Sequence, residues 1–149
     1  MKKNKLQIGK DLEVERFIYG ITRQIWESKQ INSIYDYYNE DVIVRSPRNT
    51  TYKCKDVIDS TKDTLSQFPD RQLIGEDVIW SGDYKNGILS SHRILSTATH
   101  KGNGFYGKST EKSIMYRVIA DCFIIDNKVV EEWIVRDESA ILNQLGFTA

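Results

Sequence analysis

Residues 129–146 read VVEEWIVRDESAILNQLG, and their hydrophobic period changes midway. Up to about Val135 the stretch is rich in β-branched residues, which is typical of a strand. Beyond that point the apolar residues recur at helical spacing, and Gly146 stands where a helix would stop. The stretch therefore predicts a strand over about 129–136 that leads directly into a helix over about 138–145.

Earlier in the chain, helices come first and long strands joined by turn residues come afterwards. This order indicates an α+β fold, in which three N-terminal helices pack on a curved, mostly antiparallel sheet and a short helix closes the chain. A curved sheet closed by helices leaves a conical cavity that suits small apolar ligands. The predicted segments are helices over about 11–28, 31–38 and 57–68, and strands over about 42–46, 71–80, 88–99 and 112–125.

Length and composition limit the class of protein. A chain of 149 residues predicts one domain over 1–149. Lysine plus arginine and aspartate plus glutamate balance at 21 each, so nothing indicates nucleic acid or an anionic membrane as a partner. No apolar stretch reaches signal-peptide or membrane-span length.

The two cysteines, Cys54 and Cys122, form no motif, which favours a reducing, cytoplasmic setting. No metal-ligand or nucleotide motif occurs, so we expect no cofactor.

Several short phrases carry a resemblance to a known family. They are FPD at residues 68–70, THKG at 99–102, DNKVVEEW at 126–133, and Asp137 followed by LNQLG at 142–146. Together they resemble the SnoaL-like branch of the NTF2-like superfamily over nearly the whole chain. The resemblance implies an NTF2-like cone that binds a small organic molecule. Members of the branch include polyketide ester cyclases, and the superfamily also holds isomerases, dehydratases and proteins that only bind, so the fold leaves the activity open.

The resemblance also shows which family side chains are missing. SnoaL-like cyclases use an aspartate on the last strand and a histidine on the neighbouring strand, and matching the turn at 126–128 places these at Ile134 and Ala120. The base and acid of ketosteroid isomerases fall near Ser46 and Thr22. Neither of the two standard sites is therefore copied in this chain.

Polar residues at the centre of a predicted strand are candidates for chemistry. His92 and Arg93 follow one another there, so they point to opposite faces and one of them lies in the cavity. His92 could be a general base near neutral pH, and Arg93 could hold a carboxylate or enolate oxygen. The equally weighted alternative is that one of them lines a solvated or dimer face and the other pairs structurally with a carboxylate, because strand-centre cations are rarely buried unpaired.

Asp137 is the third catalytic candidate, since it ends the last strand at the expected cavity. It also stands just before the last helix, where a carboxylate can accept from the N–H groups of Ser139 or Ala140. The cap explains Asp137 without catalysis, and we favour it.

Five further residues are candidates for substrate binding. If Ala120 and Ile134 face the cavity, alternation puts Tyr116, Glu132 and Arg136 there too, and leaves Glu131, Trp133 and Val135 on an outer face that a homodimer would cover. His100 ends a strand before a glycine-rich loop that could close over the cavity, although an exposed hairpin is the plainer interpretation. The candidates for binding are Tyr116, Glu132, Arg136, His100 and Tyr35, whose phenol could line the pocket or only its rim.

These observations favour a protein that binds a small organic ligand. The activity we expect is proton-transfer chemistry without a cofactor on a carbonyl compound, such as cyclisation, isomerisation or dehydration. The alternative is a non-catalytic ligand-binding or dimeric interaction protein, because Ile134 and Ala120 occupy the cyclase positions.

Overall fold

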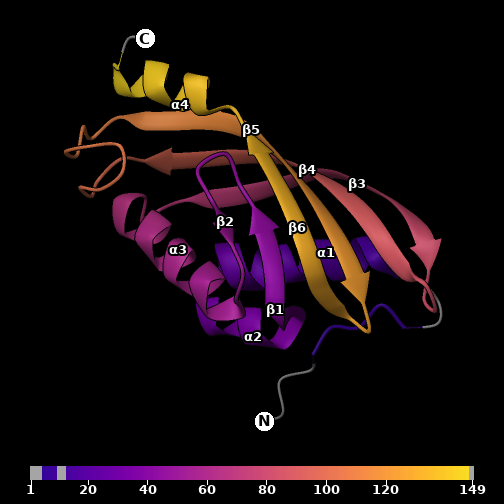
Figure 1. Ribbon diagram of the computed structural model, residues 1–149. Helices are drawn as coiled ribbons and strands as arrows, with labels where there is room; N and C mark the ends of the chain where they lie inside the picture. The colour runs from indigo at the N-terminus through magenta and orange to yellow at the C-terminus, as the bar shows by residue number, and fades with distance from the viewer. Residues whose placement is uncertain (1–4, 10–12, 148–149) are drawn as a thin grey trace.

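Long hairpins build a curved sheet, with the N-terminal helices gathered on one side of it and the C-terminal helix set apart at its other end (Figure 1). The computed structural model describes residues 5–9 and 13–147. In chain order the elements are α1 (Val14–Thr22), a π-helical turn η1 (Arg23–Glu27), a 3-10 turn η2 (Ile31–Ser33), α2 (Ile34–Tyr37), β1 (Tyr38–Arg45), β2 (Thr50–Thr51), α3 (Cys54–Gln67), β3 (Gln72–Asp83), β4 (Gly87–Thr99), β5 (Ser113–Ile125), β6 (Lys128–Arg136) and α4 (Glu138–Leu145).

The six strands form one sheet in the order β2-β1-β6-β5-β4-β3. Neighbouring strands pair antiparallel except β1 and β6, which run parallel. Two long hairpins carry β3 against β4 and β4 against β5, and the tight turn at Asp126 and Asn127, both with positive φ, returns β5 into β6. This α+β arrangement confirms the predicted NTF2-like cone with its mostly antiparallel sheet.

The helices cover the sheet with their apolar faces. In α1 the buried residues recur at helical spacing, because every third or fourth side chain meets the sheet. Buried side chains form two clusters, one under α1, α2 and β1 and the other under α4 and the far ends of β4 and β5. Trp26 and Ile134 pack against both clusters and so link them.

The junction between β6 and α4 is built as its sequence predicts. Asp137 caps the helix, since its Oδ1 accepts from the Ala140 N–H at 2.8 Å. Gly146 ends the helix in the left-handed conformation with φ 92°. Gln144 fastens α4 to the start of β5 through two hydrogen bonds with the backbone of Met115, at 2.8 and 2.9 Å.

Two local predictions need correction. The expected helix around 31–38 is only two short turns, and Tyr38 already belongs to a strand that runs eight residues to Arg45 rather than the five predicted. The two-residue strand β2 was not predicted, and neither was the parallel pairing of β1 with β6, because nothing local in the sequence encodes a partner about 90 residues away.

Among the described residues no helix has the length and apolarity needed to cross a membrane.

Candidate functional site

A cavity of about 410 Å³ lies between the sheet and the helices. Side chains from both buried clusters line it, which makes most of its wall apolar. Its apolar lining includes Ile18, Ile21, Trp26, Leu73, Ile94 and Val118. A volume of this size suits a small organic molecule with a few polar groups.

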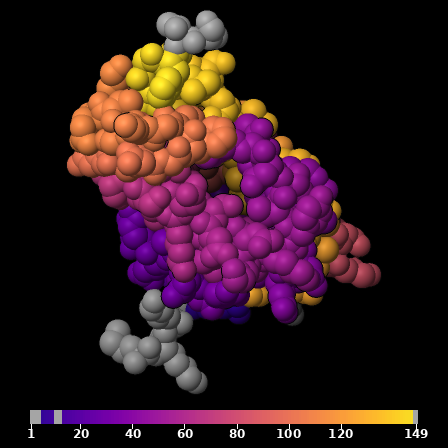
Figure 2. Space-filling model, turned by 60° about the vertical axis from the view of Figure 1, so that its left-hand side comes forward, coloured from indigo at the N-terminus to yellow at the C-terminus, as the bar shows by residue number. Residues whose placement is uncertain are grey.

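The mouth of the cavity opens where three segments meet. Figure 2 shows a hollow between α3, the β1–β2 turn and the loop that joins β4 to β5. Arg48 from the turn and Phe105 from the loop both line the cavity, and the Arg48 guanidinium carbon lies 4.3 Å from the centre of the Phe105 ring. This pair brings two loops together at the opening.

Glu132 is a carboxyl group buried in the cavity wall. It is 7 % exposed, and its Oε2 accepts from the Tyr38 hydroxyl at 3.1 Å while its Oε1 accepts from the Cys122 thiol at 3.8 Å. Burial raises the pKa of Glu132 to about 7, although both hydrogen bonds act to lower it. Burial also raises the pKa of Tyr38 and of Cys122 well above their ordinary values, so both remain protonated donors.

The strand register explains why these groups meet. Glu132 pairs with Cys122, and Cys122 pairs with Ser90, so the three form one row across β6, β5 and β4 on the inner face. The Ser90 hydroxyl is buried and has no hydrogen-bond partner among the residues that the structure describes. The row therefore places a carboxyl, a thiol and an unsatisfied hydroxyl side by side.

His92 lies in the next row of the same inner face. It pairs with Ala120, which pairs with Ile134, and all three line the cavity. The ring is 3 % exposed, and burial lowers the pKa of His92 to about 4, so the imidazole is neutral near pH 7. Its Nε2 points toward β3, where a Cβ added at Gly75 would lie 2.7 Å away, and it has no partner within the described ranges.

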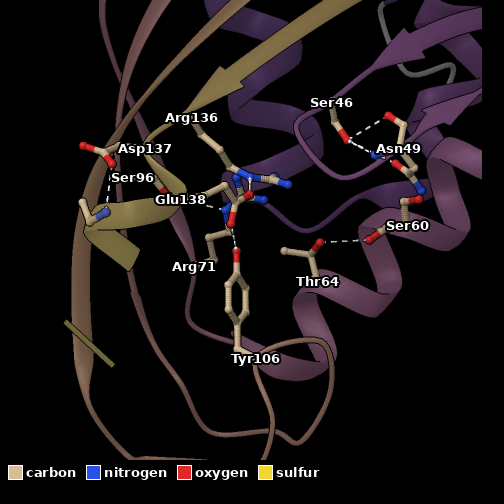
Figure 3. Close-up of polar contacts among 11 residues, drawn as sticks. Ser46, Asn49, Ser60, Thr64, Arg71, Ser96, Tyr106, Arg136, Asp137 and Glu138 are labelled. Atoms are coloured by element: carbon tan, nitrogen blue, oxygen red, sulfur yellow. Dashed lines mark hydrogen bonds and ion pairs between the residues drawn. The ribbon is translucent and has the colours of Figure 1, made fainter. Parts of the chain in front are cut away.

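A second polar cluster lies at the ends of β6 and α4. Arg136 donates to Glu138, and the Tyr106 hydroxyl donates to Oε2 of the same carboxylate at 2.5 Å, as Figure 3 shows. Although burial raises the pKa of Glu138, these two donors lower it below its usual range. Arg136 lines the cavity, so this cluster holds a charged guanidinium in the wall.

Arg71 adds a further cation to the cavity wall. It stands in the turn just before β3 and is 7 % exposed. Its Nε donates to the Ser96 hydroxyl at 3.4 Å, and its guanidinium lies over the Trp26 ring, 5.4 Å from the ring centre. No carboxylate within residues 5–9 and 13–147 forms an ion pair with it.

The structure brings some of the predicted site residues together and separates others. His92, Glu132 and Arg136 line the cavity, as do Ala120 and Ile134 at the family positions. Tyr116 is buried in the second cluster but is not part of the cavity lining.

Three expected positions need correction, and Asp137 takes the structural role that the sequence favoured. Arg93 is on the outer face, where it forms ion pairs with Glu76 and Asp77, because its neighbour His92 takes the inner face. Asp137 is occupied as a helix cap. His100 is fully buried between Phe68 and Tyr106, away from the cavity. Tyr35 is 55 % exposed.

Sequence reasoning missed three residues of the site. Tyr38 was expected on a helix, and Cys122 was treated as motif-free although alternation from Ala120 puts it on the inner face. No sequence pattern indicated that Arg71 lines the cavity, since it lies in a turn, where side chains do not alternate between two faces. Among the described residues no group of three or more histidine, cysteine, aspartate or glutamate side chains is placed to hold a metal ion.

Several solved structures share this fold. A proposed polyketide cyclase from Acidithiobacillus ferrooxidans superposes with a TM-score of 0.77 at 19 % identity, covering 97 % of this chain and 100 % of the other. IdmH, a proposed polyketide cyclase from Streptomyces antibioticus, gives 0.76 at 18 % identity over 90 % and 99 %. AclR, a proposed hydroxylase from Streptomyces galilaeus, gives 0.75 at 23 % identity over 91 % and 87 %.

The sequence itself agrees with these structures. Among curated proteins no sequence matches. The sequence profile of the SnoaL-like polyketide cyclase family, however, matches residues 16–145, which include every element from α1 to α4 except the first two residues of α1. The chain therefore belongs to the SnoaL-like polyketide cyclase family.

Proposed function

We propose that this protein is a proton-transfer enzyme that binds a small carbonyl compound in the cavity and uses Glu132 as its acid and base. The supporting observation is a carboxyl group in the cavity wall whose pKa is raised to about 7 by burial. A group that titrates near the working pH can both accept and donate a proton at a useful rate. Cyclisation, isomerisation and dehydration of a carbonyl compound all use such a transfer.

The proposed step removes a proton from the carbon next to the carbonyl group. Ionised Glu132 takes this proton, the electron pair of the C–H bond moves into the carbonyl to form an enolate, and the protonated carboxyl later returns the proton. Tyr38 and Cys122 hold the two carboxyl oxygens and fix the direction of the group. Arg136 remains charged beside Glu138 and lines the same cavity, so it can stabilise the enolate oxygen.

His92 takes a secondary role in this proposal. Its imidazole is neutral and its Nε2 is turned toward Gly75, so it is a weaker base and a less well placed one than Glu132. Glu132 and His92 flank Ile134 and Ala120 on the inner face, so the chain carries its polar groups one step away from the family positions. Such a shift keeps a proton-transfer site in the cavity while changing its geometry.

Exchange of α-protons into heavy water tests the proposal. Loss of the α-proton signals of aryl ketones and β-keto esters is followed by NMR with the wild type, Glu132→Gln and Glu131→Gln. Glu131 is the matched control because it is on the opposite face, paired with Arg45 at 2.8 Å. We expect the Glu132 variant to lose at least about 100-fold in rate and the Glu131 variant to keep it. Equal rates in both variants, or no exchange by the wild type, would contradict the proposal.

The rival proposal is a protein that binds its ligand without turnover. The observation that favours it is the apolar pair Ala120 and Ile134 at the positions where the family carries its catalytic side chains. It predicts binding of the same carbonyl compounds with no exchange in any variant.

We further propose that the outer face of the sheet joins two copies of this chain. Apolar side chains are exposed there, among them Ile79 at 67 % and Val135 at 66 %. They are flanked by charges of both signs, in Glu76 with Arg117 and Asp77 with Arg93, which makes the face complementary to itself under twofold symmetry. Sedimentation should show a dimer for the wild type and a monomer for Val135→Lys, and a monomeric wild type would contradict this.

A further inference from the structure

The cavity wall carries a guanidinium whose donors are mostly unused. Arg71 uses Nε for the Ser96 hydroxyl, and neither terminal nitrogen has a hydrogen-bond or ion-pair partner among the described residues. The contact with Trp26 leaves these donors free, because a ring meets a guanidinium through its faces and not through its N–H groups. The N–H groups of both terminal nitrogens, which lie in one plane, are therefore available to a molecule in the cavity.

The surroundings of Arg71 bring a second positive charge close to it and no carboxylate that neutralises it. The Lys29 ammonium donates to the backbone carbonyl of Arg71, and after burial the Arg71 charge is the next largest cause of the lowered pKa of Lys29. Asp70 is adjacent in sequence, but its carboxylate is exposed and accepts from the Thr99 N–H at 2.8 Å. A charge that is removed from water without a counterion is unfavourable, so this part of the wall lacks an anion.

The other charged groups of the wall do not fill this need. Glu138 is already bound by Arg136 and Tyr106. Glu132 is bound by Tyr38 and Cys122, and no hydrogen bond or ion pair joins it to Arg71. The cations of the cavity wall are Arg48, Arg71 and Arg136. The carboxylates in or beside the wall are Asp63, Glu132 and Glu138, and none of these three forms a hydrogen bond or an ion pair with Arg71.

We propose that Arg71 binds a carboxylate of the ligand, so that the cavity takes a largely apolar carboxylic acid. A planar carboxylate matches two in-plane N–H donors, whereas a phosphate group calls for several donors converging on three oxygens. The apolar side chains around the cavity then hold the body of the molecule. Binding of the carboxylate by Arg71 does not depend on the proposed function. Only the further point, that the carbonyl group of the same molecule reaches Glu132, rests on it.

Two probes of equal shape test the proposal. Naphthalene-2-carboxylate and naphthalene-2-carboxamide differ in charge but not in size, and their binding is measured by calorimetry at about pH 7.5, where the acid is ionised. We expect the wild type to bind the carboxylate at least about tenfold more tightly than the amide. A set of longer alkanoates and their amides covers ligands of other lengths. The absence of a carboxylate preference in every pair would overturn the inference, and this comparison needs no variant.

Two variants then test whether Arg71 causes the preference for the carboxylate over the amide. Arg71→Met keeps the length of the side chain and its contact with Trp26, so it should bind the amide as the wild type does and lose the preference for the acid. Arg93→Gln is the matched control, because it removes an arginine from the outer face. We also expect ligand-free Arg71→Met to melt at or above the temperature of the wild type, since an uncompensated charge is gone. A preference retained in Arg71→Met would contradict the assignment.

The proposed role of Glu132 in proton exchange and the proposed role of Arg71 in binding can be contradicted independently. Glu132→Gln should abolish proton exchange and leave the carboxylate preference in place. If exchange survives in Glu132→Gln, the proposed function fails while the role of Arg71 stands. If the preference is absent, the role of Arg71 fails whatever the exchange experiment gives.

Discussion

Tyr38 at the start of β1 donates a hydrogen bond to Glu132 of β6 at 3.1 Å, and this contact holds the carboxyl group inside the cavity. The bond stabilises the ionised carboxylate, so it lowers the pKa that burial raises. Tyr38→Phe should therefore move the pKa of Glu132 upward, by about half a unit to one unit, since a hydrogen bond to a charged group is lost. Carbon-13 NMR titration of the glutamate carboxyls measures this shift, and a downward shift would contradict the assigned geometry.

The raised pKa of Glu132 makes stability depend on pH. Between about 4.5, the ordinary value, and about 7 the folded protein holds a proton that the unfolded chain has released. The contribution of Glu132 to stability is therefore present below pH 4.5 and is lost as the pH rises through 7, by roughly 3 kcal/mol. Glu132→Gln removes this dependence, so urea unfolding should show the variant gaining on the wild type between about pH 5 and pH 8. A constant difference would mean that Glu132 titrates normally.

His92 should behave in the opposite sense. Its folded pKa of about 4 lies below the ordinary 6.5, so the unfolded chain binds the proton first as the pH falls. The stability that comes from the neutral ring is complete above pH 6.5 and is lost as the pH falls through 4. Nitrogen-15 NMR of the imidazole should show a neutral ring at about pH 5.5, and a charged ring there would show that the site is hydrated.

Asp137 caps α4, and we expect it to take no part in the reaction. Asp137→Ala should lower the free energy of unfolding by about 1 kcal/mol, because the N–H of Ala140 loses its acceptor, while Asp137→Asn should cost little. Neither change should affect proton exchange by more than about twofold, since Asp137 is not part of the cavity lining. Loss of exchange in the folded Asn variant would restore Asp137 as a catalytic candidate.

Periodicity in the sequence predicted the fold well because burial on one face repeats along each element. The period of two in β6 assigned Glu132 and Arg136 to the same face as Ile134, and both line the cavity. The same argument could not choose between His92 and Arg93, because adjacent residues always take opposite faces and either phase satisfied the local pattern. The choice became fixed only when Glu76 and Asp77 from β3 met Arg93 on the outer face.

The parts that were missed depend on contacts between distant segments. Tyr38 meets Glu132 across 94 positions of sequence, through the parallel pairing of β1 with β6. Arg71 is in a turn, where no alternation indicates its direction, and its burial follows from the packing of η1 and β4 around it. A raised carboxyl pKa likewise arises from three-dimensional burial, which composition does not encode.

The pH profile of α-proton exchange tests the central claim most directly. If ionised Glu132 is the base, the second-order rate constant should rise about tenfold per pH unit and level off above a midpoint near 7. The same midpoint should appear in Glu131→Gln, and Tyr38→Phe should move it upward. A profile that is flat from about pH 5 to pH 9, or a midpoint near 4.5 as for an ordinary glutamate, would contradict the account.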